Sequence, residues 1–82
     1  MMQVTVFSNP GCYQCEATKR HLTRTGVKFD AVLLTDNHAA YERLHDAGWR
    51  GVPVIEVRNA DGVLVDSWDG YRPGHLDRLA AA

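Results

Sequence analysis

The sequence lacks long apolar runs, and no stretch approaches the roughly 20 apolar residues that a membrane-spanning helix requires. Its start, MMQVTVFSNP, also lacks the charged segment and the long apolar segment of a secretory signal. We therefore expect a cytoplasmic protein that has no membrane partner.

An excess of charge of one sign is also missing, because 9 basic side chains are opposed by 10 acidic ones, for a formal net charge of −1. A protein that binds the phosphates of a nucleic acid would show a basic stripe instead. Repeats and low-complexity tracts are absent as well. With 82 residues, 45% of them hydrophobic, the composition predicts one globular domain over residues 1–82, and we expect a monomer.

Cysteine is scarce, and its two copies lie close together, as Cys12 and Cys15 in the stretch SNPGCYQCEATKR. Two cysteines in a reducing cytosol are poor evidence for a structural disulfide. A Cys-x-x-Cys pair there indicates either redox chemistry or metal binding. A chance pair of core cysteines is a third interpretation.

The histidines do not complete a metal site in the sequence. Zinc requires about four ligands, which usually include a second pair at a similar spacing. The chain has scattered histidines and no His-x-x-x-His repeat, namely His21, His38, His45 and His75. We therefore expect no metal, and we place these histidines on solvated helix faces without a role.

The hydrophobic pattern alternates between strand-like and helix-like periods and predicts the order β-α-β-α-β-β-α. The predicted strands cover residues 3–7, 27–34, 52–57 and 63–68. The predicted helices cover residues 12–25, a segment from N-cap candidates at 35–37 to about Ala47, and 75–82. The inner face of the first helix is predicted to carry Cys15, Thr18, Leu22 and Thr25.

A strand–helix–strand unit implies a right-handed parallel crossover, whereas the later hairpin, with its turn at residues 59–62, must be antiparallel. The result is a mixed four-stranded sheet covered by helices. A Cys-x-x-Cys beside such a unit is typical of the thioredoxin/glutaredoxin fold, and we predict this α/β fold class.

Cys12 is predicted to lie where a loop ends and the first helix begins. The unpaired N–H groups and the positive end of the helix favour an anion there, and such a position can lower a thiol pKa from ~8.5 into the range of about 3.5–7.5. Cys12 is therefore the candidate nucleophile that attacks a partner's disulfide, and the more buried Cys15 is the candidate resolving thiol. Lys19, two turns along the helix, is a candidate for electrostatic support.

Pro53 in the segment GVPV stands at the head of the third predicted strand. The pair Val52-Pro53 is similar to the position at which proteins of the thioredoxin superfamily carry a cis proline opposite the redox pair. A trans proline at the start of a strand is the alternative. With a cis bond, Val52 would offer its backbone N–H and C=O groups to an extended peptide.

The segment WDGYRP, residues 68–73, follows the last predicted strand. Trp68, Tyr71 and Arg72 are side chains suited to stacking and anchoring at an interface. Plain core closure with a turn at Gly70 is the alternative.

These segments together resemble the NrdH-redoxins, glutaredoxin-sized proteins with thioredoxin-like behaviour, over nearly the whole chain. CYQCEATKR is similar to that family's Cys-Val-Gln-Cys-x-Ala-Thr-Lys, and WDGYRP is similar to its Trp-Ser-Gly-Phe-Arg-Pro. The matching positions are Cys12, Gln14, Cys15, Ala17, Thr18, Lys19, Trp68, Gly70, Arg72 and Pro73. The chain departs from the pattern at Tyr13, Asp69 and Tyr71, where the family usually has a small aliphatic residue, Ser and Phe.

The resemblance implies an electron carrier that reduces class Ib ribonucleotide reductase and is itself re-reduced by thioredoxin reductase. Such a carrier binds no cofactor and uses NADPH indirectly, through that reductase. The residues expected to contact these partners are Tyr13, Gln14, Val52, Pro53, Trp68, Gly70, Tyr71 and Arg72.

Three other functions compete with this one. A glutaredoxin or mycoredoxin reduced by a low-molecular-weight thiol tends to carry Gly-Gly and an acidic cap near the last helix, whereas this chain has a single glycine before Tyr71, then Arg72, and Asp77 further on. A zinc-binding adaptor module is the second alternative. The arsenate-reductase or Spx-like group is the third, although its chains are longer.

Overall fold

The computed structural model describes residues 2–81 and follows the predicted order of strands and helices. Its elements are β1 (Gln3–Ser8), α1 (Tyr13–Arg24), β2 (Asp30–Leu33), the 3-10 helix η1 (Leu34–Asp36), α2 (His38–Asp46), β3 (Val54–Arg58), β4 (Leu64–Asp69) and α3 (Pro73–Ala81). The sheet order is β2-β1-β3-β4, with β1 and β2 parallel and the other neighbours antiparallel. The predicted mixed four-stranded fold is confirmed. Among the described helices, none is both long enough and apolar enough to cross a membrane.

The second strand is shorter than predicted, because it begins at Asp30 rather than at Val27. The amide of Val27 donates to the carbonyl of Leu22 at 2.9 Å and so completes the end of α1 instead of pairing in the sheet. Gly26 makes this turn with a φ of +76°, a conformation that glycine adopts without strain.

The last helix begins two residues earlier than predicted, at Pro73 instead of His75. Proline suits the first helical position, because its fixed φ fits the helix and the amide that it lacks needs no partner there. The Leu76 amide then donates to the Arg72 carbonyl at 3.1 Å, which adds the first turn.

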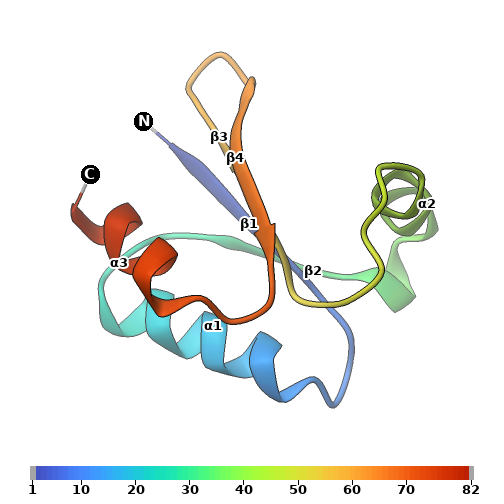
Figure 1. Cartoon of the computed structure of the whole chain (residues 1–82), viewed down its shortest axis with the longest axis horizontal. Helices are drawn as coiled ribbons and strands as arrows, with labels where there is room; N and C mark the ends of the chain where they lie inside the picture. The colour runs from blue at the N-terminus through green and yellow to red at the C-terminus, as the bar shows by residue number, and fades with distance from the viewer. Residues whose placement is uncertain (1, 82) are drawn as a thin grey trace.

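One face of the sheet is covered by α1 and α3, which lie together in Figure 1, apart from α2. Since successive residues of a strand point to opposite faces, Val4, Val6 and Ile55 all point to this side. They pack against Leu22 of α1 and Leu76 of α3, and all five side chains are buried. Burying each such side chain contributes about 1.5–3 kcal/mol, so this core fixes α1, and with it the start of the helix at Cys12, on the sheet.

The other face carries a smaller core and an ion pair. Phe7 and Val54 pack against Leu44 of α2. Beside them, the buried carboxylate of Glu56 accepts two hydrogen bonds of 2.9 Å from the Arg43 guanidinium of α2. These hydrogen bonds raise the pKa of Arg43 above its usual value. The bidentate pair therefore ties α2 to the centre of the sheet.

The Arg43–Glu56 pair gives a test of this packing. Replacing Arg43 with methionine leaves the Arg58 guanidinium, 3.6 Å away, beside the buried carboxylate. Because Arg58 still pairs with this carboxylate, the loss should stay below the ~3–5 kcal/mol of a fully broken buried ion pair, and we expect urea unfolding at neutral pH to show a loss of about 1–3 kcal/mol.

The matched control is Arg20→Met on the exposed side of α1, which should change the free energy of unfolding by no more than about 0.5 kcal/mol. Adding Glu56→Gln to Arg43→Met should recover part of the loss, because no buried charge remains. If Arg43→Met is as stable as Arg20→Met, the ion pair does not hold α2.

Candidate active site

Cys12 and Cys15 form a disulfide at the start of α1, with their Cα atoms 5.2 Å apart. Gly11, with a φ of +73°, turns the chain after Pro10, and Cys12 then adopts an extended backbone as the N-cap residue of the helix. The loop from β1 to α1 therefore presents the pair at one end of the molecule (Figure 1).

The two cysteines differ in exposure and in electrostatic environment. Cys12 is partly exposed, whereas Cys15 is fully buried. The backbone amide of Cys15 donates to Sγ of Cys12 at 3.1 Å, in the place where a capping oxygen normally accepts. A thiolate at Cys12 would keep this hydrogen bond and the positive end of the helix, and both lower a thiol pKa.

Lys19 contacts a different group from the one that the sequence suggested. Its ammonium group pairs with Glu16 at 2.8 Å, and this hydrogen bond lowers the pKa of the Glu16 carboxyl below its usual value. Because the neighbouring carboxylate compensates the charge of Lys19, the geometry gives no support to direct electrostatic help for Cys12.

The segment before β3 lies next to the cysteine pair. The Val52–Pro53 peptide bond is cis, as the similarity to the thioredoxin superfamily suggested. The carbonyl oxygen of Val52 lies 3.9 Å from Sγ of Cys12. The side chain of Pro53 is fully buried, so it shapes this segment and does not itself offer a contact surface, which corrects its expected role.

The loop after β4 is joined to both of these segments through its backbone. The amide of Gly70 donates to the Pro53 carbonyl at 2.9 Å, and the amide of Tyr71 donates to Oε1 of Gln14 at 3.0 Å. Gly70 has a φ of +80°, and a Cβ atom there would lie 3.3 Å from the same Gln14 oxygen. Three segments that are far apart in the sequence therefore meet around Cys12.

Trp68 does not contribute to an exposed surface, which corrects its predicted place beside Tyr71 and Arg72. Its side chain is 5% exposed and belongs to the core under α1 and α3, where its ring meets His75 edge-on at 4.9 Å. Tyr71 is half-buried against this core. Arg72 is exposed, and its Nε donates to the Asp69 carbonyl at 2.8 Å.

Tyr13 is the most prominent side chain beside the redox pair. It lies between the two cysteines in the sequence, and it is 79% exposed. A phenol ring in this position is available to any protein that approaches Cys12.

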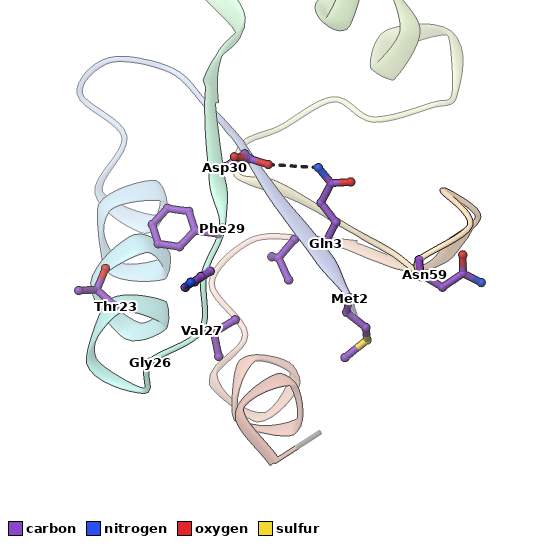
Figure 2. Close-up of a pocket in the computed structure, with 11 residues that line it drawn as sticks. Met2, Gln3, Thr23, Gly26, Val27, Phe29, Asp30 and Asn59 are labelled. Carbon is purple, nitrogen blue, oxygen red and sulfur yellow. Dashed lines mark hydrogen bonds between the residues drawn. The ribbon is translucent and has the colours of Figure 1, made fainter.

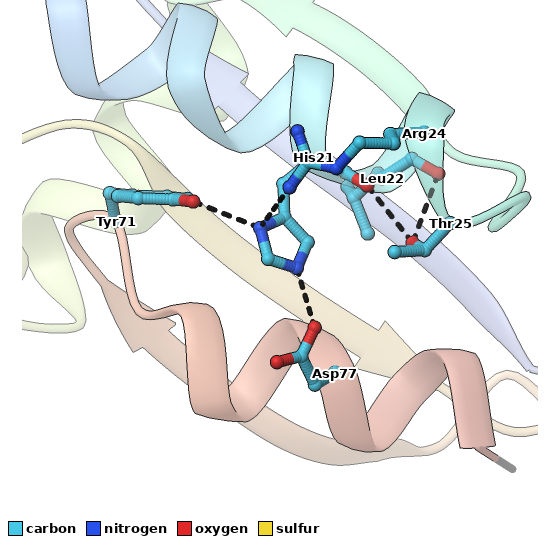
Figure 3. Close-up of polar contacts among 6 residues, drawn as sticks. All are labelled: His21, Leu22, Arg24, Thr25, Tyr71 and Asp77. Carbon is cyan, nitrogen blue, oxygen red and sulfur yellow. Dashed lines mark hydrogen bonds and ion pairs between the residues drawn. The ribbon is translucent and has the colours of Figure 1, made fainter.

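His21 is not on a solvated face, so that prediction was wrong. Its ring is buried between α1, α3 and the loop after β4, where it contacts Tyr71 and Asp77 (Figure 3). Thr25, predicted to face inward, is exposed instead. The spacing of His21 from Thr18 placed it near the inner face, but its polarity hid this from the hydrophobic pattern.

Two grooves differ in their relation to the cysteines. A groove of about 870 Å³ lies at the opposite end of β1 (Figure 2), where Met2, Val27 and Phe29 are among its lining residues. A smaller groove of about 280 Å³ reaches Val52 and is bordered by Trp49. Only the smaller groove adjoins the candidate site. Trp49 stands in the segment GWRGVPV, where no sequence pattern marked it as a site residue.

Metal ligands are not gathered at the pair. Within residues 2–81, no group of three or more His, Cys, Asp or Glu side chains is arranged to hold a metal ion. Cys12 and Cys15 are bonded to each other in this part of the chain. The arrangement is suited to dithiol–disulfide exchange.

Several known proteins are similar to this chain in sequence and in fold. The Glutaredoxin family model matches residues 4–62. The chain is 39% identical over 77 residues to the gene 56 protein of Mycobacterium phage L5, covering 93% of this chain and 70% of that protein. It is 32% identical over 81 residues to the glutaredoxin-like protein NrdH of Escherichia coli K12, covering 99% and 93% respectively. The solved structure of the E. coli NrdH-redoxin matches with a TM-score of 0.80 and 34% identity over 94% of this chain and 93% of that one.

The different environments of the two cysteines predict different reactivities after reduction. We expect iodoacetamide to modify Cys12 much faster than the buried Cys15, with a rate that rises through a midpoint pH below ~8.5, the usual thiol value. Timed quenching followed by mass spectrometry of the cysteine peptide measures both rates. Cys15→Ser keeps the backbone amide and should keep the Cys12 rate. Equal labelling of the two thiols, or a midpoint at or above the usual value, would contradict the assignment.

Proposed function

Since this chain belongs to the glutaredoxin family and to its NrdH-type glutaredoxin-like redox proteins, we propose that it carries electrons from thioredoxin reductase to a class Ib ribonucleotide reductase. The observation that carries the proposal is the Cys12–Cys15 disulfide at a helix N-terminus, beside the backbone carbonyl of Val52. The membership in the NrdH-type proteins supports the choice of a class Ib ribonucleotide reductase as the proposed partner. The E. coli NrdH-redoxin is described as having a thioredoxin-like activity profile, which supports thioredoxin reductase as the electron source.

In the proposed reaction, the Cys12 thiolate attacks one sulfur of the partner's disulfide. The partner's S–S bond breaks, its second sulfur leaves as a thiolate that takes up a proton, and Cys12 is joined to the partner. Cys15 then loses its proton and attacks Sγ of Cys12, which releases the partner's other thiol. The partner gains two electrons, and the chain returns to the disulfide state seen in the structure.

Re-reduction runs through the same atoms in the opposite direction. A dithiol of thioredoxin reductase attacks the Cys12–Cys15 disulfide, and NADPH restores that reductase. The chain itself binds no cofactor in this scheme, and the cytoplasm is the proposed location of the reaction.

The partner's cysteine segment is proposed to lie extended along Val52, pairing with its backbone as an added strand does. Tyr13, 79% exposed, would contact this segment from the cysteine side. The groove of about 280 Å³ next to Val52, bordered by Trp49, would take a neighbouring side chain. Gln14, Gly70 and Tyr71 support this surface through their hydrogen bonds and close packing.

A low-molecular-weight thiol is less well supported as the reductant. Asp77, the acidic side chain expected to cap such a thiol, is already bonded to His21 at 2.7 Å. In the loop between β4 and α3, the exposed side chain of Arg72 is a cation and therefore cannot act as an acidic cap.

Coupled turnover separates the two reductants. With NADPH, thioredoxin reductase and a disulfide substrate, we expect NADPH oxidation that depends on this chain and is abolished by Cys12→Ser. With glutathione and glutathione reductase in place of thioredoxin reductase, we expect the background rate. Reduction by glutathione alone, at a rate above that with thioredoxin reductase, would overturn the proposed electron source.

Trapping tests the proposed acceptor. Cys15→Ser removes the resolving thiol, so a mixed disulfide through Cys12 should accumulate when the reduced variant meets oxidised class Ib ribonucleotide reductase. Non-reducing electrophoresis and mass spectrometry of the cross-linked peptide identify the bond. Cys12→Ser is the matched control and should trap nothing. If Cys12→Ser traps the reductase and Cys15→Ser does not, the roles of the two cysteines are inverted.

A further inference from the structure

His21 is held by polar contacts from two other parts of the fold. Its Nδ1 lies 2.9 Å from the Tyr71 hydroxyl, and its Nε2 lies 2.7 Å from Oδ1 of Asp77 in α3. Nη2 of Arg24, one turn along α1, lies 3.2 Å from Nδ1. Figure 3 shows the ring between the Tyr71 loop and α3, with each ring nitrogen aimed at a different element.

The neighbours determine what one ring nitrogen does. A carboxylate oxygen only accepts hydrogen bonds, so Nε2 carries a hydrogen and donates it to Asp77. Nδ1 is the ring atom that meets Tyr71, and a phenol hydroxyl can either donate or accept there. The bond between His21 and Tyr71 therefore does not depend on which of the two atoms supplies the hydrogen.

Tyr71 connects this ring to the redox pair. Its hydroxyl is bonded to His21, while its backbone amide is bonded to Oε1 of Gln14, one of the two residues between the cysteines. The family pattern has Phe where this chain has Tyr71, so the hydroxyl that meets His21 is a departure from that pattern. The distance from His21 to the cysteine turn is thus bridged by a single residue.

We propose that His21 is a positioning residue for electron transfer. Through Nδ1 it holds the Tyr71 side chain, and through Tyr71 it holds the loop of residues 69–73 against Gln14. Asp77 orients the ring for this task by accepting from Nε2. The interaction sets how well a partner docks beside Cys12, and it leaves the thiol chemistry unchanged. This inference rests on the proposed function for its kinetic effect, but its structural part can be measured without any partner.

Two near-isosteric replacements distinguish the two ring nitrogens. The carboxamide of asparagine reaches about as far along the side chain as Nδ1, whereas that of glutamine reaches about as far as Nε2. His21→Asn should therefore keep the bond to Tyr71, and His21→Gln should keep only the bond to Asp77. Tyr71→Phe removes the hydroxyl alone and leaves His21 in place.

Coupled turnover with NADPH and thioredoxin reductase gives the kinetic test. One lost hydrogen bond corresponds to about a three- to tenfold change in affinity, so His21→Gln and Tyr71→Phe should each raise KM for this chain by that factor. The kcat should stay within about twofold, because the cysteines are untouched. His21→Asn should behave as the unmodified chain. The double variant should be no worse than either single one, because both remove the same bond.

The control is His38→Gln, the same change at an exposed histidine of α2 that pairs with Glu42. It should leave KM unchanged. The rate at which dithiothreitol reduces the disulfide should be the same in all the variants as in the unmodified chain, because this small reductant needs no docking surface. If His21→Asn raises KM as much as His21→Gln, or if Tyr71→Phe leaves KM unchanged, the Nδ1–Tyr71 bond does not position the loop. Equal losses with dithiothreitol would show a general structural defect and would also overturn the proposal.

Nuclear magnetic resonance reads the structural part without a partner. The backbone amide at position 71 should exchange faster in His21→Gln and Tyr71→Phe than in His21→Asn, because only the last variant keeps a partner for the Tyr71 hydroxyl. Unchanged exchange in all variants would overturn the positioning role. These measurements remain decisive if thioredoxin reductase does not turn the protein over, which would refute only the proposed electron source.

Discussion

Two backbone amides of the loop after β4 hold the candidate site together. Gly70 donates to the carbonyl of Pro53, and Tyr71 donates to the side chain of Gln14. These bonds hold three segments in fixed positions relative to one another, namely the cysteine turn, the segment before β3 and this loop. A bond of this kind contributes only about 1 kcal/mol, so the arrangement also needs the close approach that Gly70 allows. The rest of the site depends on that approach.

The start of α1 serves both folding and chemistry. The Cys15 amide that caps the helix through Sγ of Cys12 is also the donor that would stabilise a thiolate there. Helix formation and thiol reactivity therefore share one interaction. Leu22 fixes the same helix on the sheet. Cys15 is fully buried, whereas Cys12 is partly exposed. The fold thus presents one sulfur and protects the other.

The departures from the family pattern have partners within the chain. The Tyr71 hydroxyl meets His21, and the Asp69 carboxylate lies 3.6 Å from the Arg72 guanidinium. Tyr13 is different, because its side chain is exposed. The first two changes alter how the loop is held, whereas Tyr13 alters what an approaching partner meets. The contacts that hold the loop and the exposed surface beside Cys12 therefore depart from the family pattern at separate residues.

The order of elements, the mixed sheet and the redox pair could be predicted from the amino-acid sequence, because hydrophobic period, turn residues and Cys-x-x-Cys spacing are local patterns. The sequence also located β2 and α3, but it misplaced their starts, since the Val27 amide and the Arg72 carbonyl are used in helix ends. The burial of Trp68 in the core and of His21 against Tyr71 became visible only in the folded arrangement. Burial and hydrogen bonding depend on how distant elements pack, and no pattern along the chain records those distances.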